Sequence, residues 1–359
     1  MNSKYKLILI LILMVVTTIN IWSDTTSYTF LTLPTNARQV FMGSMADLQN
    51  IDGLYVNPAS TTHELPSSPY NWEAQITGYE LAGLAKYANL AFTRTITPRW
   101  GSFGFGFIYF GNSDIPVIDE RGKEQGSANV YDLAFLINYS RRLPLDIIAG
   151  VNVKILYNKL YYTSGTNYAF DLGFKRRFII SKNPLWISIS GNHLGAKTQF
   201  AKQEDLSETL SRKEIKKDNY NPIGSRLPAT IFFSLSYSLK SYLPYGLDIT
   251  FGPQTEYIIN ELFFYGGGIK VRKNINNISI FIGSRYQAGL VIGSWSVGGG
   301  LAYKFRNVMT DLSCGFIPYG NFDDSVAISL KVSYLMINKK SEQMKKKQGL
   351  EVDTESEKK

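Results

Sequence analysis

The chain has 359 residues, with 38 Lys and Arg against 29 Asp and Glu, so its formal net charge is +9. One cysteine excludes an internal disulfide, and one cysteine with two histidines excludes the clustered ligands of a structural zinc site. We therefore expect no metal and no cofactor, whereas the charge fits either nucleic acid or an anionic membrane surface.

Residues 1–23 have the organisation of a secretory signal peptide. A basic start, "MNSKYK", precedes the apolar run "LILILILMVVTTINIW", and Ser23 ends it with a small residue. An uncleaved N-terminal anchor is the alternative interpretation. Export argues against a nucleic-acid partner. After residue 24 no run of about 18 apolar residues occurs, so we expect no further transmembrane helix.

Residues 24–69 form a segment ahead of the strand-like region. The spacing of Val40, Met45 and Leu48 predicts a short amphipathic helix, and Gly43 and Gly53 are residues that can interrupt or end it. In "GLYVNPAST", Pro58 fixes φ and Asn57 can bind neighbouring backbone, which predicts a rigid turn. That turn either lies inside the folded domain or simply leads into the first strand.

From residue 70 the sequence alternates with period 2, which is typical of strands. In "SFGFGFIYF" the aromatic residues Phe103, Phe105 and Phe107 share one face, and small residues occupy the other. The predicted strands span residues 70–79, 86–96, 100–110, 129–140, 145–157, 166–178, 184–193, 229–239, 245–256, 261–272, 276–286, 290–304, 308–318 and 325–336.

Strands of about ten residues cross a bilayer when tilted, and even strand numbers are usual in bacterial outer-membrane barrels. We therefore predict an all-β fold, a 14-stranded antiparallel transmembrane barrel over residues 70–336, with a secreted soluble β-protein as the alternative. Residues 337–359 are charged and predict a disordered periplasmic tail.

The connections support this topology. Both long predicted loops, 111–128 and 194–228, fall on one rim, and the opposite rim has short turns rich in Arg and Lys. Short turns are expected on the periplasmic rim. Ordinary solvation at strand ends is the simplest explanation of its basic residues. Around Leu206, Leu210 and Ile215 the longer loop predicts either an amphipathic helix over the mouth or a solvated surface loop.

The segment before the barrel resembles the N-terminal hatch of FadL-type outer-membrane long-chain fatty acid transporters and their relatives, including PorV-like proteins. The matching residues are Ala37, Arg38, Met42, Gly43, Asp52, Asn57, Pro58 and Ala59. The chain departs from the family pattern at Ser44-Met45, where Gly-Ala is usual, and at Ser60. The resemblance implies a 14-stranded barrel whose lumen the hatch plugs.

The resemblance also implies uptake of long-chain fatty acids or similar hydrophobic molecules, with loop capture, lumen binding and hatch-gated release. Candidate ligand-binding residues are Phe41 and Met45, with Met42, for the tail and Lys154, Lys175, Lys270 and Arg285 for a head group. These cations have an alternative role, pairing with Asp132, Asp171 or Asp248, and Arg38 has one in tying the hatch to the wall.

Other functions remain open. A FadL-like barrel can act as a secretion or assembly shuttle, and a general porin is disfavoured by an apolar hatch. A barrel lipase needs a Ser–His pair, and the two histidines, His63 and His193, lie ahead of the barrel and near a strand end. We therefore predict no catalytic residue. Substrate identity and oligomeric state are not encoded in any pattern of the sequence.

Overall fold

The computed structural model describes residues 27–48, 50–62, 70–81, 83–97, 100–119, 121–160, 163–198, 201–202, 225–244, 246–259, 261–289, 295–319 and 323–335. Within them no helix is both long and apolar enough to cross a lipid bilayer. The predicted signal peptide, the charged tail, His63 and the loop helix around Leu206 lie outside these residues.

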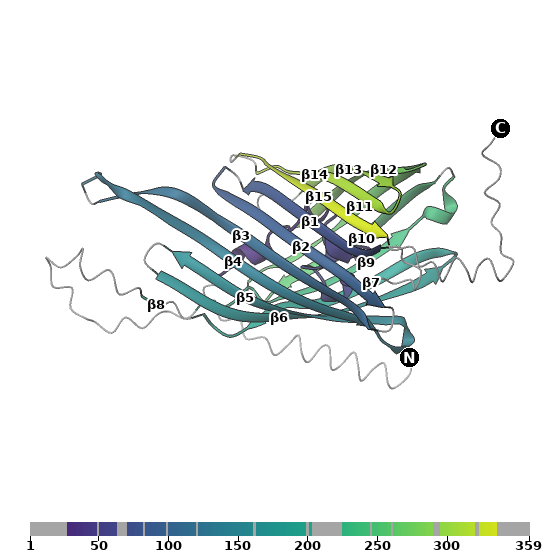
Figure 1. Ribbon diagram of the computed structural model, residues 1–359, viewed down its shortest axis with the longest axis horizontal. Coiled ribbons are helices and arrows are strands. Elements are labelled where there is room, and N and C mark those ends of the chain that lie inside the picture. Colours follow the sequence, from purple (N-terminus) through teal and green to yellow (C-terminus); the bar gives the residue numbers. More distant parts are fainter. Residues whose placement is uncertain are drawn as a thin grey trace.

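Fourteen long strands and one two-residue strand form a single antiparallel sheet (Figure 1). The strands are β1 Tyr70–Leu81, β2 Ala85–Thr97, β3 Gly101–Ile118, β4 Glu124–Arg142, β5 Ile147–Leu160, β6 Thr163–Ile180, β7 Asn183–Gly195, β8 Ala201–Lys202, β9 Thr230–Ser238, β10 Leu247–Ile258, β11 Phe263–Ile275, β12 Ile278–Ala288, β13 Trp295–Phe305, β14 Val308–Ile317 and β15 Ser325–Leu335. Each long strand overlaps one predicted segment, so the predicted strand number is confirmed.

The sheet closes on itself. β1 pairs with β15, the last strand, with Ile76 opposite Leu330, and β5 pairs with β6, with Val153 opposite Phe170. The short β8 adds to the end of β6. Closure leaves no long unpaired edge, which is the condition for strands to lie in a lipid environment.

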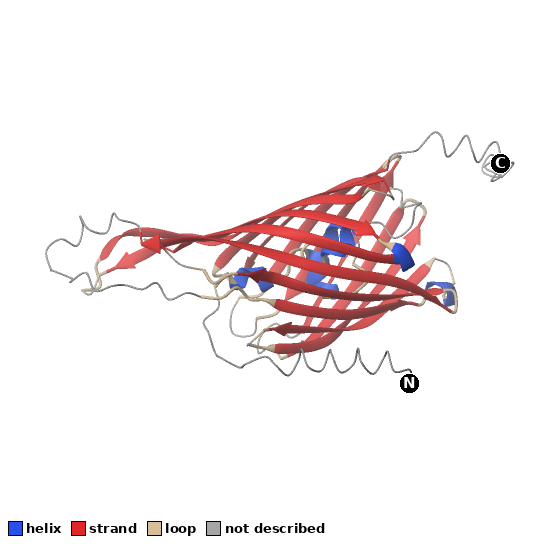
Figure 2. Cartoon of the chain, turned by 90° about the horizontal axis from the view of Figure 1, so that it is seen from below, coloured by secondary structure: helices blue, strands red, loops and turns tan. Residues whose placement is uncertain are grey.

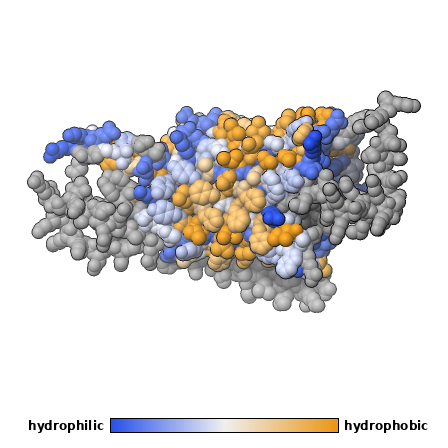
Figure 3. Space-filling view, viewed as in Figure 1, coloured by the Kyte–Doolittle hydropathy of each residue, from blue (hydrophilic) through white to orange (hydrophobic). Residues whose placement is uncertain are grey.

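The two faces of the wall differ in chemistry. Outward-facing residues are large, apolar and exposed, for example Ile76, Phe105 and Ile282 at 56%, 46% and 61%. Inward-facing residues are buried and mostly polar, for example Asn138 and Ser140. In Figure 3 the hydrophobic residues gather over the middle of the wall, with hydrophilic residues toward its ends. This pattern is that of a barrel with lipid outside and a polar interior.

The prediction of a long loop over residues 111–128 is wrong. β3 and β4 continue as a paired hairpin to Ile118 and Glu124, projecting beyond the rest of the barrel (Figure 1). The register shifts on both sides of Pro116, which lacks an N–H donor. At the tip, Asp119 Oδ1 accepts hydrogen bonds from the N–H groups of Arg121 and Lys123, both at 2.9 Å. Backbone hydrogen bonds between β3 and β4 therefore extend the two strands through residues whose polar sequence predicts a loop.

The rim predicted to have short turns has them, in the connections from β2 to β3, β4 to β5, β6 to β7, β9 to β10, β11 to β12 and β13 to β14. It contains the 3-10 helices η4 Pro144–Asp146 and η5 Lys240–Tyr242. The opposite rim carries the β3–β4 hairpin and the connection between β7 and β9. Trp186 of β7 faces the interior and is only 5% exposed.

Candidate functional site in the barrel interior

Residues 27–62, here called the N-terminal segment, lie inside the barrel, where short helices are visible between the strands (Figure 2). These helices are η1 Thr29–Thr32, α2 Ala37–Met42, η2 Asn50–Gly53 and η3 Pro58–Thr61. α2 contacts β11 to β15, and η3 contacts β3 to β6, on the other side. The segment therefore crosses the interior from wall to wall.

The helix predicted around Val40, Met45 and Leu48 is shorter than that spacing suggests. Asn36 caps α2 by accepting a hydrogen bond from Gln39 N–H at 2.9 Å. Gly43 ends it with φ of 70°, and a Cβ there would collide with the side chains of Gln254 and Arg285. Met45 and Leu48 thus follow the helix rather than extend it.

Ionic contacts join the N-terminal segment to the wall at Arg38 and Asp52. Arg38 forms an ion pair with Asp311 of β14, and its Nη1 lies 3.3 Å from Asp52 Oδ2. Lys331 Nζ of β15 lies 2.6 Å from the same oxygen, and Gln75 Nε2 of β1 donates to Asp52 Oδ1 at 2.8 Å. The Arg38 contacts match the structural role that the sequence left as its alternative.

The pKa of Asp52 reflects two opposing effects. Burial raises the pKa. The charges of Lys331 and Arg38, with the hydrogen bonds from Lys331 and Gln75, lower it by more, so that the pKa is about 2. Asp52 is therefore a carboxylate at neutral pH, and its charge holds both cations in place.

The turn at Asn57, Pro58 and Ala59 is bound to the barrel wall as well as being stabilised by a hydrogen bond within the turn. Asn57 Oδ1 accepts from Ala59 N–H at 2.8 Å, as its turn role predicts. Its Nδ2 donates to Ser188 Oγ at 2.7 Å and to the carbonyls of Phe174 and Ile189, both at 3.1 Å. The turn is thus held by β6 and β7, in the barrel interior.

Two strand glycines make this approach possible. A Cβ at Gly150 of β5 would collide with the backbone of Pro58 and Ala59, and one at Gly173 of β6 with Asn57 and Pro58. Asn138 of β4 donates to Pro58 O at 3.1 Å. Wall and turn therefore fit only because the wall lacks side chains at these positions.

The apolar residues of the N-terminal segment form a small core with the wall. Phe41, Met42 and Met45 are at most 2% exposed and cluster with Phe281 of β12 and Ala302 of β13. The rings of Phe41 and Phe281 stack with centroids 6.1 Å apart. The residues expected to line a ligand tail are brought together, but protein side chains fill the space between them.

The four candidate head-group cations do not converge on one point. Lys154 pairs with Asp171 at 2.8 Å, as the alternative prediction has it. Lys175 Nζ donates to Leu48 O at 2.8 Å, and Lys270 pairs with Asp47 of the N-terminal segment. Arg285 differs, because it has no ion pair within the described residues.

Arg285 is 8% exposed, and its Nε is buried with no hydrogen-bond partner in the described part of the chain. It interacts electrostatically with Glu256 of β10 without forming an ion pair. An unsatisfied buried guanidinium nitrogen is energetically unfavourable, so Arg285 is the candidate cation best able to gain from an added acceptor.

Sequence reasoning missed the role of His193. Both Asn192 and His193 are buried, because a register shift between β6 and β7 interrupts the alternation and His193 has φ of 58°. Its Nδ1 lies 2.9 Å from Lys154 Nζ, and its N–H donates to Asp171 Oδ1 at 2.8 Å. A bulge has no strong signal in an alternating sequence, apart from the glycines beside it.

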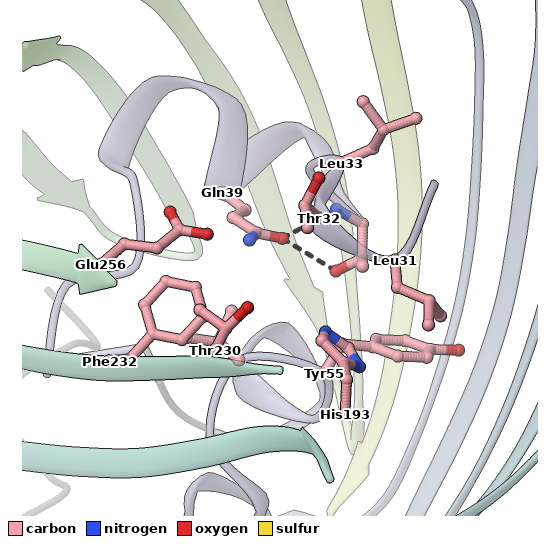
Figure 4. Close-up of a pocket in the computed structure, with 11 residues that line it drawn as sticks. Leu31, Thr32, Leu33, Gln39, Tyr55, His193, Thr230, Phe232 and Glu256 are labelled. Carbon is pink, nitrogen blue, oxygen red and sulfur yellow. Dashed lines mark hydrogen bonds between the residues drawn. The ribbon is translucent and has the colours of Figure 1, made fainter. Parts of the chain in front are cut away.

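His193 borders a pocket between the N-terminal segment and the wall (Figure 4). Its lining consists of Leu31, Thr32, Leu33, Thr35, Gln39, Tyr55, Val56, His193, Thr230, Phe232 and Glu256. The cavity measures about 20 Å³, room for about one water molecule. A larger ligand therefore requires movement of the N-terminal segment.

Comparison with solved structures shows the fold. The chain is similar to the CymD monoaromatic hydrocarbon channel, at TM-score 0.54 and 10% identity, over 85% of this chain and 98% of that one. It is also similar to a deltaS2 mutant of the TodX monoaromatic hydrocarbon channel, at TM-score 0.53 and 10% identity, over 86% and 100%. The P. putida toluene transporter TodX aligns at TM-score 0.50 and 10% identity, over 85% and 98%.

No family model matches the sequence, and no curated protein matches it. The structural likeness confirms the predicted fold, a closed barrel of 14 long strands of the outer-membrane type. At this identity it shows the fold alone.

Proposed function

We propose that the protein is a channel of the bacterial outer membrane that takes up hydrophobic small molecules, with residues 24–69 acting as a hatch. The observation that carries this proposal is the N-terminal segment inside the barrel. It spans the interior between Asp311 on one side and Ser188 on the other. Its side chains Phe41 and Met45 form part of a buried apolar cluster in that interior. Similarity to hydrocarbon channels supports the same class of cargo.

A filled interior separates this function from that of a general porin. Ions and sugars need a continuous aqueous path, which a segment fastened to opposite walls interrupts. Release of cargo then requires the ionic contacts of Arg38 and Asp52 to loosen, so that the small cavity beside His193 enlarges.

Long-chain fatty acids are the more specific cargo that we propose. An apolar tail fits the surroundings of Phe41, Met42 and Met45, and Arg285, whose buried Nε has no hydrogen-bond partner among the described residues, is suited to a carboxylate. Lys154, Lys175 and Lys270 already have protein partners, so we assign them to holding the interior together. An uncharged hydrocarbon would not need Arg285.

The test is a titration of refolded chain in detergent with a fluorescent long-chain fatty acid and, separately, with an uncharged fluorescent hydrocarbon. A deletion of residues 24–60 is the comparison, and circular dichroism checks that it remains rich in strand. We expect saturable binding that the deletion abolishes. A folded barrel that binds neither probe would contradict uptake and favour the secretion or assembly shuttle.

Liposome swelling with a small sugar separates the porin function. We expect no swelling with the intact chain and rapid swelling with the deletion. Swelling with the intact chain would show an open aqueous path and would contradict the hatch.

A further inference from the structure

Four cations lie near the same end of the barrel on its outer face, each on a different strand. Arg94 of β2, Arg141 of β4, Arg176 of β6 and Lys273 of β11 lie at the rim with the short turns, here called the outer basic rim. By strand alternation all four point outward, and three are exposed while Arg176 is half-buried. They thus face the surroundings of the barrel rather than its interior.

Each of these cations follows an outward-facing apolar or aromatic residue two positions earlier. Those residues are Phe92, Tyr139, Phe174 and Val271. A spacing of two residues places the charges roughly 7 Å closer to the rim than the apolar side chains. On each of these four strands, an apolar or aromatic outward-facing residue is therefore followed directly by a cation at the next outward-facing position.

Acidic side chains do not neutralise this rim. In the described part of the chain, the exposed acid on this rim is Asp146, which already lies 3.9 Å from Arg142. None of the four cations has an ion pair within the described residues. Ordinary solvation would be satisfied by charges of either sign, so it does not explain the bias.

The opposite rim is the natural comparison. Its exposed charges in the described ranges mix both signs, with Glu80, Glu261 and Asp323 beside Lys86 and Lys123. The excess of positive charge is therefore specific to one end of the barrel.

Aromatic side chains accompany the outer basic rim. The guanidinium of Arg176 lies 4.6 Å from the ring centroid of Phe178, and that of Arg306, in the β13–β14 turn at the same end, lies 5.4 Å from the ring centroid of Phe305. Trp100 is 67% exposed at the same end, and Tyr139 donates to its carbonyl at 3.1 Å. Aromatic rings with cations mark the depth of lipid head groups.

We propose that the outer basic rim binds the phosphates of anionic phospholipids in the membrane leaflet at that end. Guanidinium groups form bidentate hydrogen bonds with phosphate oxygens, and cations distributed around the rim attract head groups that carry net negative charge. A zwitterionic head group carries its own ammonium and is attracted less. The proposal depends on the barrel lying in a membrane, and not on its cargo.

The test uses tryptophan quenching in vesicles. The protein used is a variant in which Trp22, Trp72, Trp186 and Trp295 are changed to Phe, so that Trp100 is its single tryptophan. Brominated phosphatidylglycerol and brominated phosphatidylethanolamine of matched acyl chains are compared as quenchers at equal mole fraction. We expect phosphatidylglycerol to be favoured about fivefold or more beside Trp100.

A second chain, which keeps only Trp295, reports on the opposite rim, where we expect no preference. R94Q/R141Q/R176Q/K273Q should bring the preference beside Trp100 to about one, while R94K/R141K/R176K should retain it. Equal quenching by both lipids beside Trp100, or an unchanged preference in the Gln variant, would overturn the proposal.

If the Gln variant does not refold, ionic strength replaces it on the Trp100 chain. Added salt should reduce the preference steadily, because exposed charges are screened. A preference that is independent of salt would overturn the electrostatic proposal.

Discussion

Lys331 Nζ lies 2.6 Å from Asp52 Oδ2, joining the last strand of the barrel to the N-terminal segment inside it. The two residues are 279 positions apart, and both side chains are nearly inaccessible. Asp52 also contacts Arg38, which pairs with Asp311 as well, so the Asp52 carboxylate bridges two buried cations. The charge of Asp52 is thus central to keeping the segment in place.

Asp52→Asn should loosen the N-terminal segment, because it leaves Arg38 and Lys331 without their shared anion. Removing one partner of a buried ionic contact destabilises by roughly 3–5 kcal/mol. We expect frequent openings in planar-bilayer conductance recordings, whereas the unaltered chain stays closed. Asp146→Asn, at the exposed pair with Arg142, is the control and should change nothing measurable. Equal conductance of the two variants would contradict the role of Asp52.

Acidification should open the unaltered barrel. The pKa of Asp52 is about 2 when folded and 3.8 ordinarily. A lowered folded pKa stabilises the folded state fully above about pH 4, and this contribution, roughly 2 kcal/mol, is lost as the pH falls toward 2. Conductance should therefore rise between pH 4 and 2.

Asp47 contributes to the same acid response. Burial raises its pKa, but the charge and hydrogen bond of Lys270, together with the charges of Lys175 and Arg272, lower the pKa overall. In Asp52→Asn the conductance should already be raised at neutral pH, and the remaining acid step should be smaller. An acid step of unchanged size in that variant would show that other groups control opening.

Gly150→Ala should displace the turn at Pro58 while leaving the barrel intact. The added Cβ would collide with the backbone of Pro58 and Ala59, which cannot rotate away as a side chain can. Gly78→Ala is the matched control, because its Cβ would meet only Tyr87 O, at 3.9 Å. We expect equal strand content by circular dichroism but faster proteolysis of the N-terminal segment in Gly150→Ala alone. Equal protection in both variants would argue against tight docking.

Arg285→Gln should separate charged from uncharged cargo. Loss of a charge-assisted hydrogen bond should weaken binding of a long-chain fatty acid roughly tenfold or more. Binding of an uncharged hydrocarbon should be unaffected. Lys304→Gln, at an exposed strand end, is the control. If Arg285→Gln binds both probes as the unaltered chain does, the carboxylate is held elsewhere or is not recognised.

The sequence alone predicts the strands and their number. Alternation with period 2 is a local property, and the contrast between Phe105 outside and Asn138 inside follows from it directly. The turn at Asn57 and Pro58 is equally local, since one side chain and one ring determine it.

Only the tertiary structure decides which groups meet across the interior. Asp311 and Lys331 read as inward-facing polar residues of two strands, and nothing in their neighbourhood indicates Arg38 or Asp52 as partners. Those contacts depend on the register of every strand between them and on how the N-terminal segment enters. For the same reason three of the four candidate cations have ionic or hydrogen-bonded protein partners, whereas Arg285 has no ion pair and its Nε no hydrogen bond within the residues that the structure describes. The alternating sequence determines the strands of the wall, whereas closure of the barrel determines which side chains meet in its interior.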